Sequence, residues 1–237
     1  MAKTFRAIAL ATAAIFAVAA TPNWNTVIEE TDGGHRLGNA EAEQQLIEFV
    51  SYTCPHCASF ERESEGPLKL MFVHPGAGSV EIRQLIRNEV DLTAAMLAGC
   101  GAQERFFANH TALMLGQEDW FAKGRNLTDA QTARWEAGDG PARQAMARDL
   151  GWYDMFEARG YSVVELDRCL ADQAEADRIV AQSEADAAQY GVRGTPSFVL
   201  NGELLDGVHN WAALGAALQG KPLPMPAATG AHEGHAH

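Results

Sequence analysis

The chain has 237 residues and a formal net charge of −13 at pH 7, an acidic balance that repels phosphate backbones and anionic lipid surfaces. Nucleic acid is therefore not an expected partner. The length suffices for one large domain, or two small ones, with a full hydrophobic core, so the four cysteines are not needed in place of hydrophobic burial. They call for a specific explanation.

The first twenty residues have the pattern of a secretory signal peptide. Lys3 and Arg6 precede an apolar run over residues 7–16, and small residues follow it. Cleavage is expected near Ala19 or Ala20, which predicts export. The apolar run is shorter than a membrane-spanning helix, which needs about 20 residues. An N-terminal anchor that is not cleaved is the alternative.

Strand and helix patterns alternate in the next part of the chain. Residues 27–28 suggest a short first strand, and residues 45–53 (QLIEFVSYT) form a β-favouring apolar run that suits a buried central strand. This run leads directly into the motif CPHC at residues 54–57. Apolar spacing then predicts a helix that is interrupted near residues 66–67, where Gly precedes Pro. Residues 79–86 (SVEIRQLI) alternate well enough for another strand.

From about residue 90 to residue 190 the sequence shows helical spacing and no convincing strand. One clear helical face consists of Ala176, Ile179, Val180, Ser183, Ala187 and Tyr190. This long stretch is therefore predicted to be a helical subdomain inserted between two β-rich segments.

The sequence next predicts a strand at residues 197–200 (SFVL). The pair Asn201-Gly202 follows, which is the strongest short signal for a hairpin turn. A closing helix is predicted over residues 210–218, with Asn210 at its cap position. Residues 221–237 are rich in Pro, Ala and Gly without apolar periodicity, and are expected to be disordered.

The CPHC spacing suits either a reactive disulfide or one half of a zinc site. A zinc site needs a second pair of Cys or His ligands, whereas Cys100 and Cys169 stand alone in the sequence. No metal site is therefore predicted at this motif.

The position of the motif indicates chemistry at sulfur. Cys54 is placed where a strand becomes a helix, and Pro55 suits the first helical turn. The helix N-terminus, and His56 if it is protonated, would stabilise a Cys54 thiolate. Cys57, inside the helix, is expected to be the more buried, resolving sulfur. The pair should therefore form a reactive, oxidising disulfide.

Two segments, LIEFVSYTCPHCASFE (46–61) and GVRGTPSFVLNG (191–202), resemble the periplasmic disulfide oxidase DsbA and its relatives. The resemblance implies an α/β protein with the thioredoxin fold and an inserted helical subdomain, located in the periplasm. DsbA is the standard example of a protein with a low cysteine pKa and an oxidising redox potential. The sizes of these two effects are therefore what the resemblance implies for Cys54 and for the Cys54–Cys57 pair. The expected organisation is a signal peptide (1–20), a first thioredoxin-like part (21–89), a helical insertion (90–190), a second thioredoxin-like part (191–220) and a His-containing tail (221–237).

The family pattern carries over to further positions. Thr195-Pro196 matches the cis-proline loop that offers backbone groups to a bound substrate peptide, although only about 5–6% of X-Pro bonds are cis in folded proteins, and a trans proline is the alternative. Glu48 matches a buried acid that relays protons near the resolving cysteine, unless it lies on a solvated strand face. Glu61 matches another acidic position, which a surface helix charge explains equally well.

The other cysteines and the tail histidines have two interpretations each. Cys100 and Cys169 are expected to form a structural disulfide, because an oxidising compartment would not leave both thiols reduced; the alternative is that each is a small buried hydrophobe. The tail carries three histidines that could bind copper or zinc, unless it is a flexible segment without function. These histidines are His232, His235 and His237.

The sequence thus predicts an exported oxidase that passes the Cys54–Cys57 disulfide to reduced, folding proteins and needs no cofactor. The resemblance implies reoxidation by a quinone-linked membrane thiol oxidase. A reductase or isomerase is the nearest alternative, because Thr195 stands where well-known oxidases have valine. The short distance from signal peptide to central strand leaves no room for the isomerases' dimerisation domain, which favours a monomer. A copper-handling binding protein remains a further alternative, and a glutathione transferase is disfavoured because that branch lacks the CxxC pair.

Overall fold

The structure is a computed structural model that describes residues 22–220, so the predicted signal peptide and the His-containing tail lie outside the described residues. Six strands form one sheet: β1 (Ile28–Glu30), β2 (Gly34–Gly38), β3 (Gln44–Val50), β4 (Gly78–Gln84), β5 (Ser197–Leu200) and β6 (Glu203–Leu204). Their order across the sheet is β1-β2-β4-β3-β5-β6. Strands β3 and β4 run parallel, and the other neighbouring strands run antiparallel.

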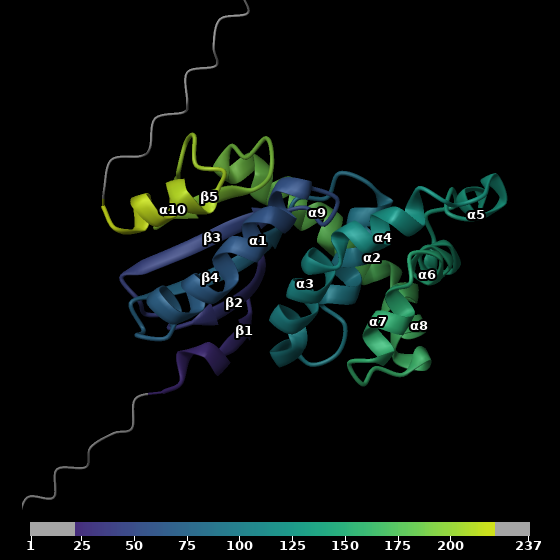
Figure 1. Ribbon diagram of the computed structural model, residues 1–237, viewed down its shortest axis with the longest axis horizontal. Coiled ribbons are helices and arrows are strands. Elements are labelled where there is room, and N and C mark those ends of the chain that lie inside the picture. Colours follow the sequence, from purple (N-terminus) through teal and green to yellow (C-terminus); the bar gives the residue numbers. More distant parts are fainter. Residues whose placement is uncertain (1–21, 221–237) are drawn as a thin grey trace, which may run out of the picture.

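The helices divide into those beside the sheet and those of a long insertion. A short 3-10 turn, η1 (Trp24–Thr26), precedes the sheet, α1 (Pro55–Leu68) continues into the π-helical turn η2 (Lys69–Val73), and α10 (Trp211–Leu218) closes the fold. Between β4 and β5 lie α2 (Glu89–Ala98), η3 (Gln103–Arg105), α3 (Phe106–Leu115), α4 (Gln117–Gly124), α5 (Asp129–Ala133), α6 (Gly140–Asp149), α7 (Trp152–Glu157), α8 (Val163–Ala171) and α9 (Gln173–Tyr190). Figure 1 shows the sheet, α1 and α10 at one end of the molecule and α2 to α8 at the other.

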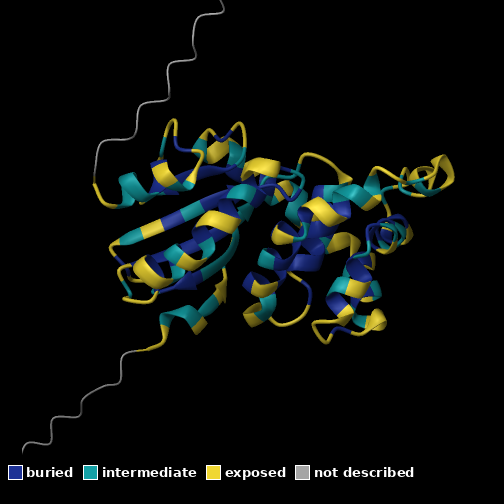
Figure 2. Cartoon of the chain, viewed as in Figure 1, coloured by how far each residue is buried: buried dark blue, intermediate teal, exposed yellow. Residues whose placement is uncertain are grey.

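Strand β3 is covered on both faces, as its apolar sequence predicts. Leu46 and Val50 point to the face on which α1 and α10 pack, and Phe49 points to the opposite face, where it meets Val192 and Val199. Successive side chains of a strand point to opposite faces. Burial of these three residues therefore places much of the strand in the core. Figure 2 shows buried, dark blue segments both in the sheet and in the helices beside it.

The predicted interruption of the first helix is wrong. Pro67 lies inside α1, which runs to Leu68 and continues as η2. Proline removes a backbone N–H from the helical ladder, and the following turn widens to π-helical spacing, in which the His74 N–H donates to the Lys69 carbonyl oxygen at 2.8 Å. The helix therefore continues past the proline with a wider turn.

Strand β2 was not predicted. Its sequence, GHRLG, has two glycines and little β propensity. It is held by antiparallel pairing on both sides, with β1 and with β4. Ladder hydrogen bonds from two neighbours thus outweigh a weak local preference.

Every regular element between β4 and β5 is a helix. Helix α2 is the most enclosed of them, since eight of its residues, from Asp91 to Ala98, are buried. A helix that is buried all round belongs at the centre of a helical layer. None of the helices within residues 22–220 combines the length and the hydropathy that crossing a membrane requires.

Candidate functional site

Cys54 lies where the central strand gives way to α1. Its backbone is extended (φ −92°, ψ 114°), and it is the N-cap residue of the helix. Pro55 occupies the first turn, where its missing N–H removes no helical hydrogen bond. The Cys57 N–H donates to the Cys54 carbonyl oxygen at 3.1 Å, so the two cysteines share the first turn. The sequence predicted this placement correctly.

The two cysteine side chains are free thiols that differ in exposure. Cys54 is 4% exposed and Cys57 is 1% exposed, and His56 between them is exposed to solvent. A partner entering from solvent therefore meets Cys54 first.

The pKa values of the two thiols are driven apart. The hydrogen bond from the Cys57 thiol is the largest cause that lowers the pKa of Cys54, from 9.0 to about 5. Thr195 and the backbone N–H groups of Cys57 and His56 add to this, and burial opposes it. Burial is the main cause that raises the pKa of Cys57, and its hydrogen bond to Cys54 acts in the same direction. Hydrogen bonds at the helix N-terminus thus favour a thiolate on Cys54, whereas burial favours a thiol on Cys57.

This difference predicts the titration of the reduced protein. The ultraviolet absorbance of the thiolate should rise with a midpoint near pH 5, and the rise should vanish in Cys54→Ser. Because folding lowers this pKa, the reduced form gains stability that is complete above pH 9 and is lost as the pH falls through about 5. A first thiolate midpoint near 9 would contradict the expectation.

The cis-proline loop lies against Cys54. The Thr195-Pro196 peptide bond is cis, and the Cys54 thiol donates to the Thr195 carbonyl oxygen at 3.3 Å. His209 contacts the Pro196 carbonyl oxygen through Nδ1 at 2.8 Å, and because a carbonyl only accepts, Nδ1 carries the proton in this contact. The loop therefore holds backbone groups beside the reactive sulfur.

Both predicted acidic residues are buried, which excludes the solvated alternatives. Glu48 on β3 is 3% exposed, and Glu61 on α1 is 7% exposed. Burial first, and then the charge of Glu61, raise the pKa of Glu48 well above its ordinary value. Burial would also raise the pKa of Glu61, but hydrogen bonding and charge from His110 outweigh it and lower that pKa.

Sequence reasoning missed the residues that fix the loop before the motif. Asp91 of α2 is fully buried and accepts hydrogen bonds from the Ser51 hydroxyl and the Thr53 N–H, both at 2.8 Å. Gln117 of α4 donates to the Cys54 carbonyl oxygen at 3.0 Å. Asn88 and Asp91 form a recognisable helix-capping pattern, but local spacing gives no signal that Asp91 also contacts the motif.

Cys100 and Cys169 form a disulfide bond in the helical insertion, with Cα atoms 5.8 Å apart. Cys100 follows the end of α2, and Cys169 lies in α8. The bond therefore joins the segment after α2 to α8, which lies 69 residues further along the sequence. Cys100 and Cys169 thus pair with each other and not with the cysteines of the CPHC motif.

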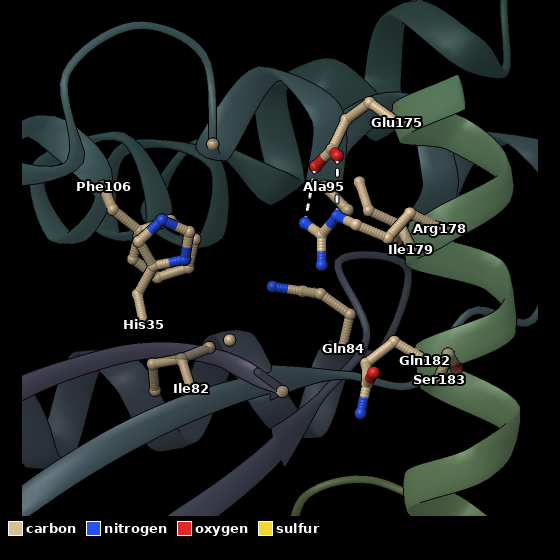
Figure 3. A pocket seen from close by; sticks show the side chains of 13 residues that line it. His35, Ile82, Gln84, Ala95, Phe106, Glu175, Arg178, Ile179, Gln182 and Ser183 are labelled. Atoms are coloured by element: carbon tan, nitrogen blue, oxygen red, sulfur yellow. Dashed lines mark hydrogen bonds and ion pairs between the residues drawn. The ribbon is translucent and has the colours of Figure 1, made fainter. Parts of the chain in front are cut away.

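A cavity between the sheet and α9 belongs to a different part of the molecule. Figure 3 shows His35 stacked on Phe106, with ring centroids 3.8 Å apart, beside the ion pair of Glu175 and Arg178. Burial is the main cause that lowers the pKa of His35 to about 4, and Arg178 adds to it. No predicted site residue lines this cavity, so the CPHC turn and the cis-proline loop form the candidate site.

The chain is similar to a known family and to solved structures. A family model described as thioredoxin matches residues 30–220. A solved protein-disulfide isomerase from Novosphingobium aromaticivorans is 45% identical, with a TM-score of 0.76 over 80% of this chain and 97% of that chain. Wolbachia pipientis α-DsbA1 is 24% identical, with a TM-score of 0.55 over 72% of this chain and 75% of that chain, and shares the fold.

A curated relative is longer than the region that it shares with this chain. A Rickettsia typhi protein provisionally named protein-disulfide oxidoreductase is 26% identical over 166 residues, which are 70% of this chain and 54% of that protein. The chain therefore spans about half the length of the curated relatives that it matches. The family model covers most of the chain. The chain belongs to the thioredoxin family and has the thioredoxin fold.

Proposed function

We propose that this protein is an exported thiol-disulfide oxidoreductase that works as an oxidase, donating its Cys54–Cys57 disulfide to reduced proteins in the periplasm. The observation that carries the proposal is the position of Cys54 at the N-terminus of α1 and against the cis-proline loop. There, hydrogen bonds from the Cys57 thiol, from Thr195 and from backbone N–H groups lower the pKa of Cys54 to about 5. A thiol that prefers its thiolate form is a good leaving group, and its stability favours the reduced pair over the disulfide. A disulfide built on such a sulfur oxidises substrate dithiols.

The proposed reaction begins at the more exposed sulfur. A substrate thiolate attacks Cys54 Sγ, the Cys54–Cys57 bond breaks, and Cys57 leaves with the electron pair and takes up a proton. Glu48 is proposed as the source of that proton. A second substrate thiolate then attacks the substrate sulfur of the mixed disulfide, which forms the substrate disulfide and releases the Cys54 thiolate. Thr195 and Pro196 are proposed to hold the substrate backbone.

Turnover requires an oxidant from outside this chain, because each cycle leaves both cysteines reduced. We propose a quinone-linked membrane thiol oxidase for this step, with the protein acting as a monomer. The 45% identical protein from Novosphingobium aromaticivorans is a protein-disulfide isomerase, and this similarity favours a second candidate function. An isomerase or reductase would use the same cysteines but would be kept reduced.

The redox potential separates these functions. The full chain would be equilibrated with glutathione buffers, and free thiols at Cys54 and Cys57 would be trapped and quantified by mass spectrometry. We expect a potential well above thioredoxin's value of about −270 mV, toward about −120 mV. A potential close to thioredoxin's would overturn the oxidase assignment and favour a reductase.

A further inference from the structure

The cis-proline loop, residues 194–197, is held in place through its carbonyl oxygens. One bond lies within the loop, where the Ser197 hydroxyl donates to the Gly194 oxygen at 2.8 Å. The next oxygen, that of Thr195, accepts from the Cys54 thiol at 3.3 Å. A loop whose backbone has few hydrogen bonds to the rest of the fold is free to move, so these contacts decide how well the loop keeps its shape.

The bond from Cys54 is present in only one chemical state of the sulfur. A thiolate has no proton to donate, and neither has a sulfur in a disulfide. Hydrogen bonds from the Cys57 thiol and other neighbours lower the pKa of Cys54 to about 5, so the reduced residue is a thiolate in neutral solution. In the oxidised protein, and in a mixed disulfide, the same atom is bonded to another sulfur. The Thr195 oxygen therefore lacks its Cys54 donor in every state that takes part in exchange.

The third carbonyl oxygen of the loop, that of Pro196, is held by a contact that does not depend on the sulfur. His209 Nδ1 lies 2.8 Å from this oxygen and donates to it. An imidazole that gains a second proton keeps the first on Nδ1, so the bond survives both charge states of the ring. Among the hydrogen bonds of residues 22–220, it is the only one that links these three carbonyls to another segment without Cys54.

The chain on both sides of His209 fixes where its ring can reach. Val208 is fully buried in the main core, and Asn210 caps α10 by accepting from the Ala213 N–H at 2.9 Å. The ring of His209 is exposed to solvent, so burial in the core does not explain why a histidine stands here. Because the backbone around it is already ordered, His209 loses little conformational entropy when it bonds to the loop.

We propose that His209 is a positioning residue, which holds the cis-proline loop through the Pro196 carbonyl while a protein substrate is bound at Cys54. The inference rests on the thiol-disulfide exchange of the proposed function, in which Thr195 and Pro196 hold the substrate backbone, but not on the direction of exchange. His209 acts through the loop and takes no part in the bonds that break and form.

This role separates two kinds of substrate. An extended peptide places its backbone along the loop, and if the loop is mobile, the free energy of ordering it opposes each binding event. A small dithiol such as dithiothreitol has no peptide backbone to place there. Loss of the His209 bond should therefore weaken the reaction with peptides and leave the reaction with a small dithiol unchanged.

Two substitutions of similar size separate the hydrogen bond from the bulk of the side chain. In His209→Asn the amide nitrogen can take the place of Nδ1 and donate to the Pro196 oxygen. In His209→Leu the shape is similar, but no donor remains. We therefore expect His209→Asn to behave like the wild type and His209→Leu to show the defect.

The experiment measures reduction of the Cys54–Cys57 disulfide in the full chain at neutral pH. Oxidised protein is mixed either with an unstructured peptide that carries two cysteine thiols or with dithiothreitol, and the reaction is followed by acid quench and mass spectrometry. For His209→Leu we expect the peptide concentration at half-maximal rate to rise about three- to tenfold, the effect of losing one hydrogen bond. The limiting rate, and the rate with dithiothreitol, should stay close to those of the wild type.

A second readout follows the loop itself. Hydrogen exchange of a proteolytic fragment that contains residues 194–197 should be faster in His209→Leu than in the wild type, and His209→Asn should restore the slower exchange. This measurement needs no substrate, so it tests the hydrogen bond independently of activity.

The matched control is His74→Leu, which removes another exposed histidine. His74 follows η2, at the far end of α1 from Cys54, and its Nδ1 lies 3.4 Å from the Asn25 amide nitrogen. This variant should change neither the peptide kinetics nor the hydrogen exchange of the loop.

Peptide kinetics of His209→Leu that match the wild type would overturn the proposal. An equal defect in His209→Asn would also overturn it, because the ring and not the donor would then matter. So would an equal slowing with dithiothreitol, which would indicate general damage to the reactive turn. Failure of the proposed function would look different, since wild-type protein would then show no saturable reaction with the peptide, whereas the hydrogen-exchange result would be unaffected.

Discussion

Replacing Cys57 with serine is expected to convert the protein into a trap that accumulates covalent complexes with its substrates. Cys54 keeps the helix N-terminus and the Thr195 carbonyl in this variant, so it still exchanges with substrate disulfides or activated thiols. The buried sulfur that would resolve the mixed disulfide is missing. Non-reducing electrophoresis with mass spectrometry should show substrates bound to Cys54, and turnover should fall to the level of exchange without protein.

The matched variant is Cys54→Ser, which should neither trap substrates nor turn over, because Cys57 is only 1% exposed and its pKa is raised by burial. Trapping by Cys54→Ser, or wild-type turnover by Cys57→Ser, would contradict the assignment of the attacked and the resolving sulfur.

Removing the disulfide of the helical insertion is expected to cost about 4 kcal/mol of unfolding free energy. Cys100 and Cys169 are 69 residues apart in the sequence, and closing a loop of this length restricts the unfolded chain by roughly that amount in the chain-entropy model. Urea unfolding of Cys100→Ser/Cys169→Ser, compared with the wild type, measures the difference.

The control for this loss is Cys54→Ser/Cys57→Ser under the same conditions. These two cysteines are free thiols in the structure, so below pH 5, where the Cys54 thiolate contributes no stability, this variant and wild-type protein with a reduced Cys54–Cys57 pair should unfold at similar urea concentrations. An unchanged unfolding midpoint in the Cys100/Cys169 variant would mean that the bond is not an important constraint on the unfolded chain.

Local sequence patterns predicted most of the thioredoxin-like part because each of its signals is contained in a short segment. Examples are the apolar run of β3, the proline after Cys54 and the cap residue Asn210. Each of these features affects the backbone only within a few residues of its own position. Strand β2 escaped prediction because its stability comes from its neighbours. The predicted interruption of the helix near residues 66–67 was wrong because the widened turn after Pro67 lets the helix continue, and apolar spacing does not reveal such a turn.

The sequence identified the two reactive cysteines of the site but not the side chains that surround them. Whether Glu48 and Glu61 face water depends on α3, whose packing against α1 no pattern within either segment specifies. His110 and Gln117 contact Glu61 and Cys54 across more than forty residues of chain. Side-chain contacts of this kind arise only after the helices have packed, so single-sequence spacing carries no information about them.

The contacts of Asp91 and Gln117 make the helical insertion a structural component of the candidate site. These two side chains bind the Ser51 hydroxyl, the Thr53 N–H and the Cys54 carbonyl, so the wall behind the reactive turn is built from inserted residues. Excising the insertion to obtain a minimal catalyst would leave those polar groups without partners. The inserted helices are therefore not an independent module. Exchanging them between relatives would also change the conformation of the loop that leads into the CPHC motif.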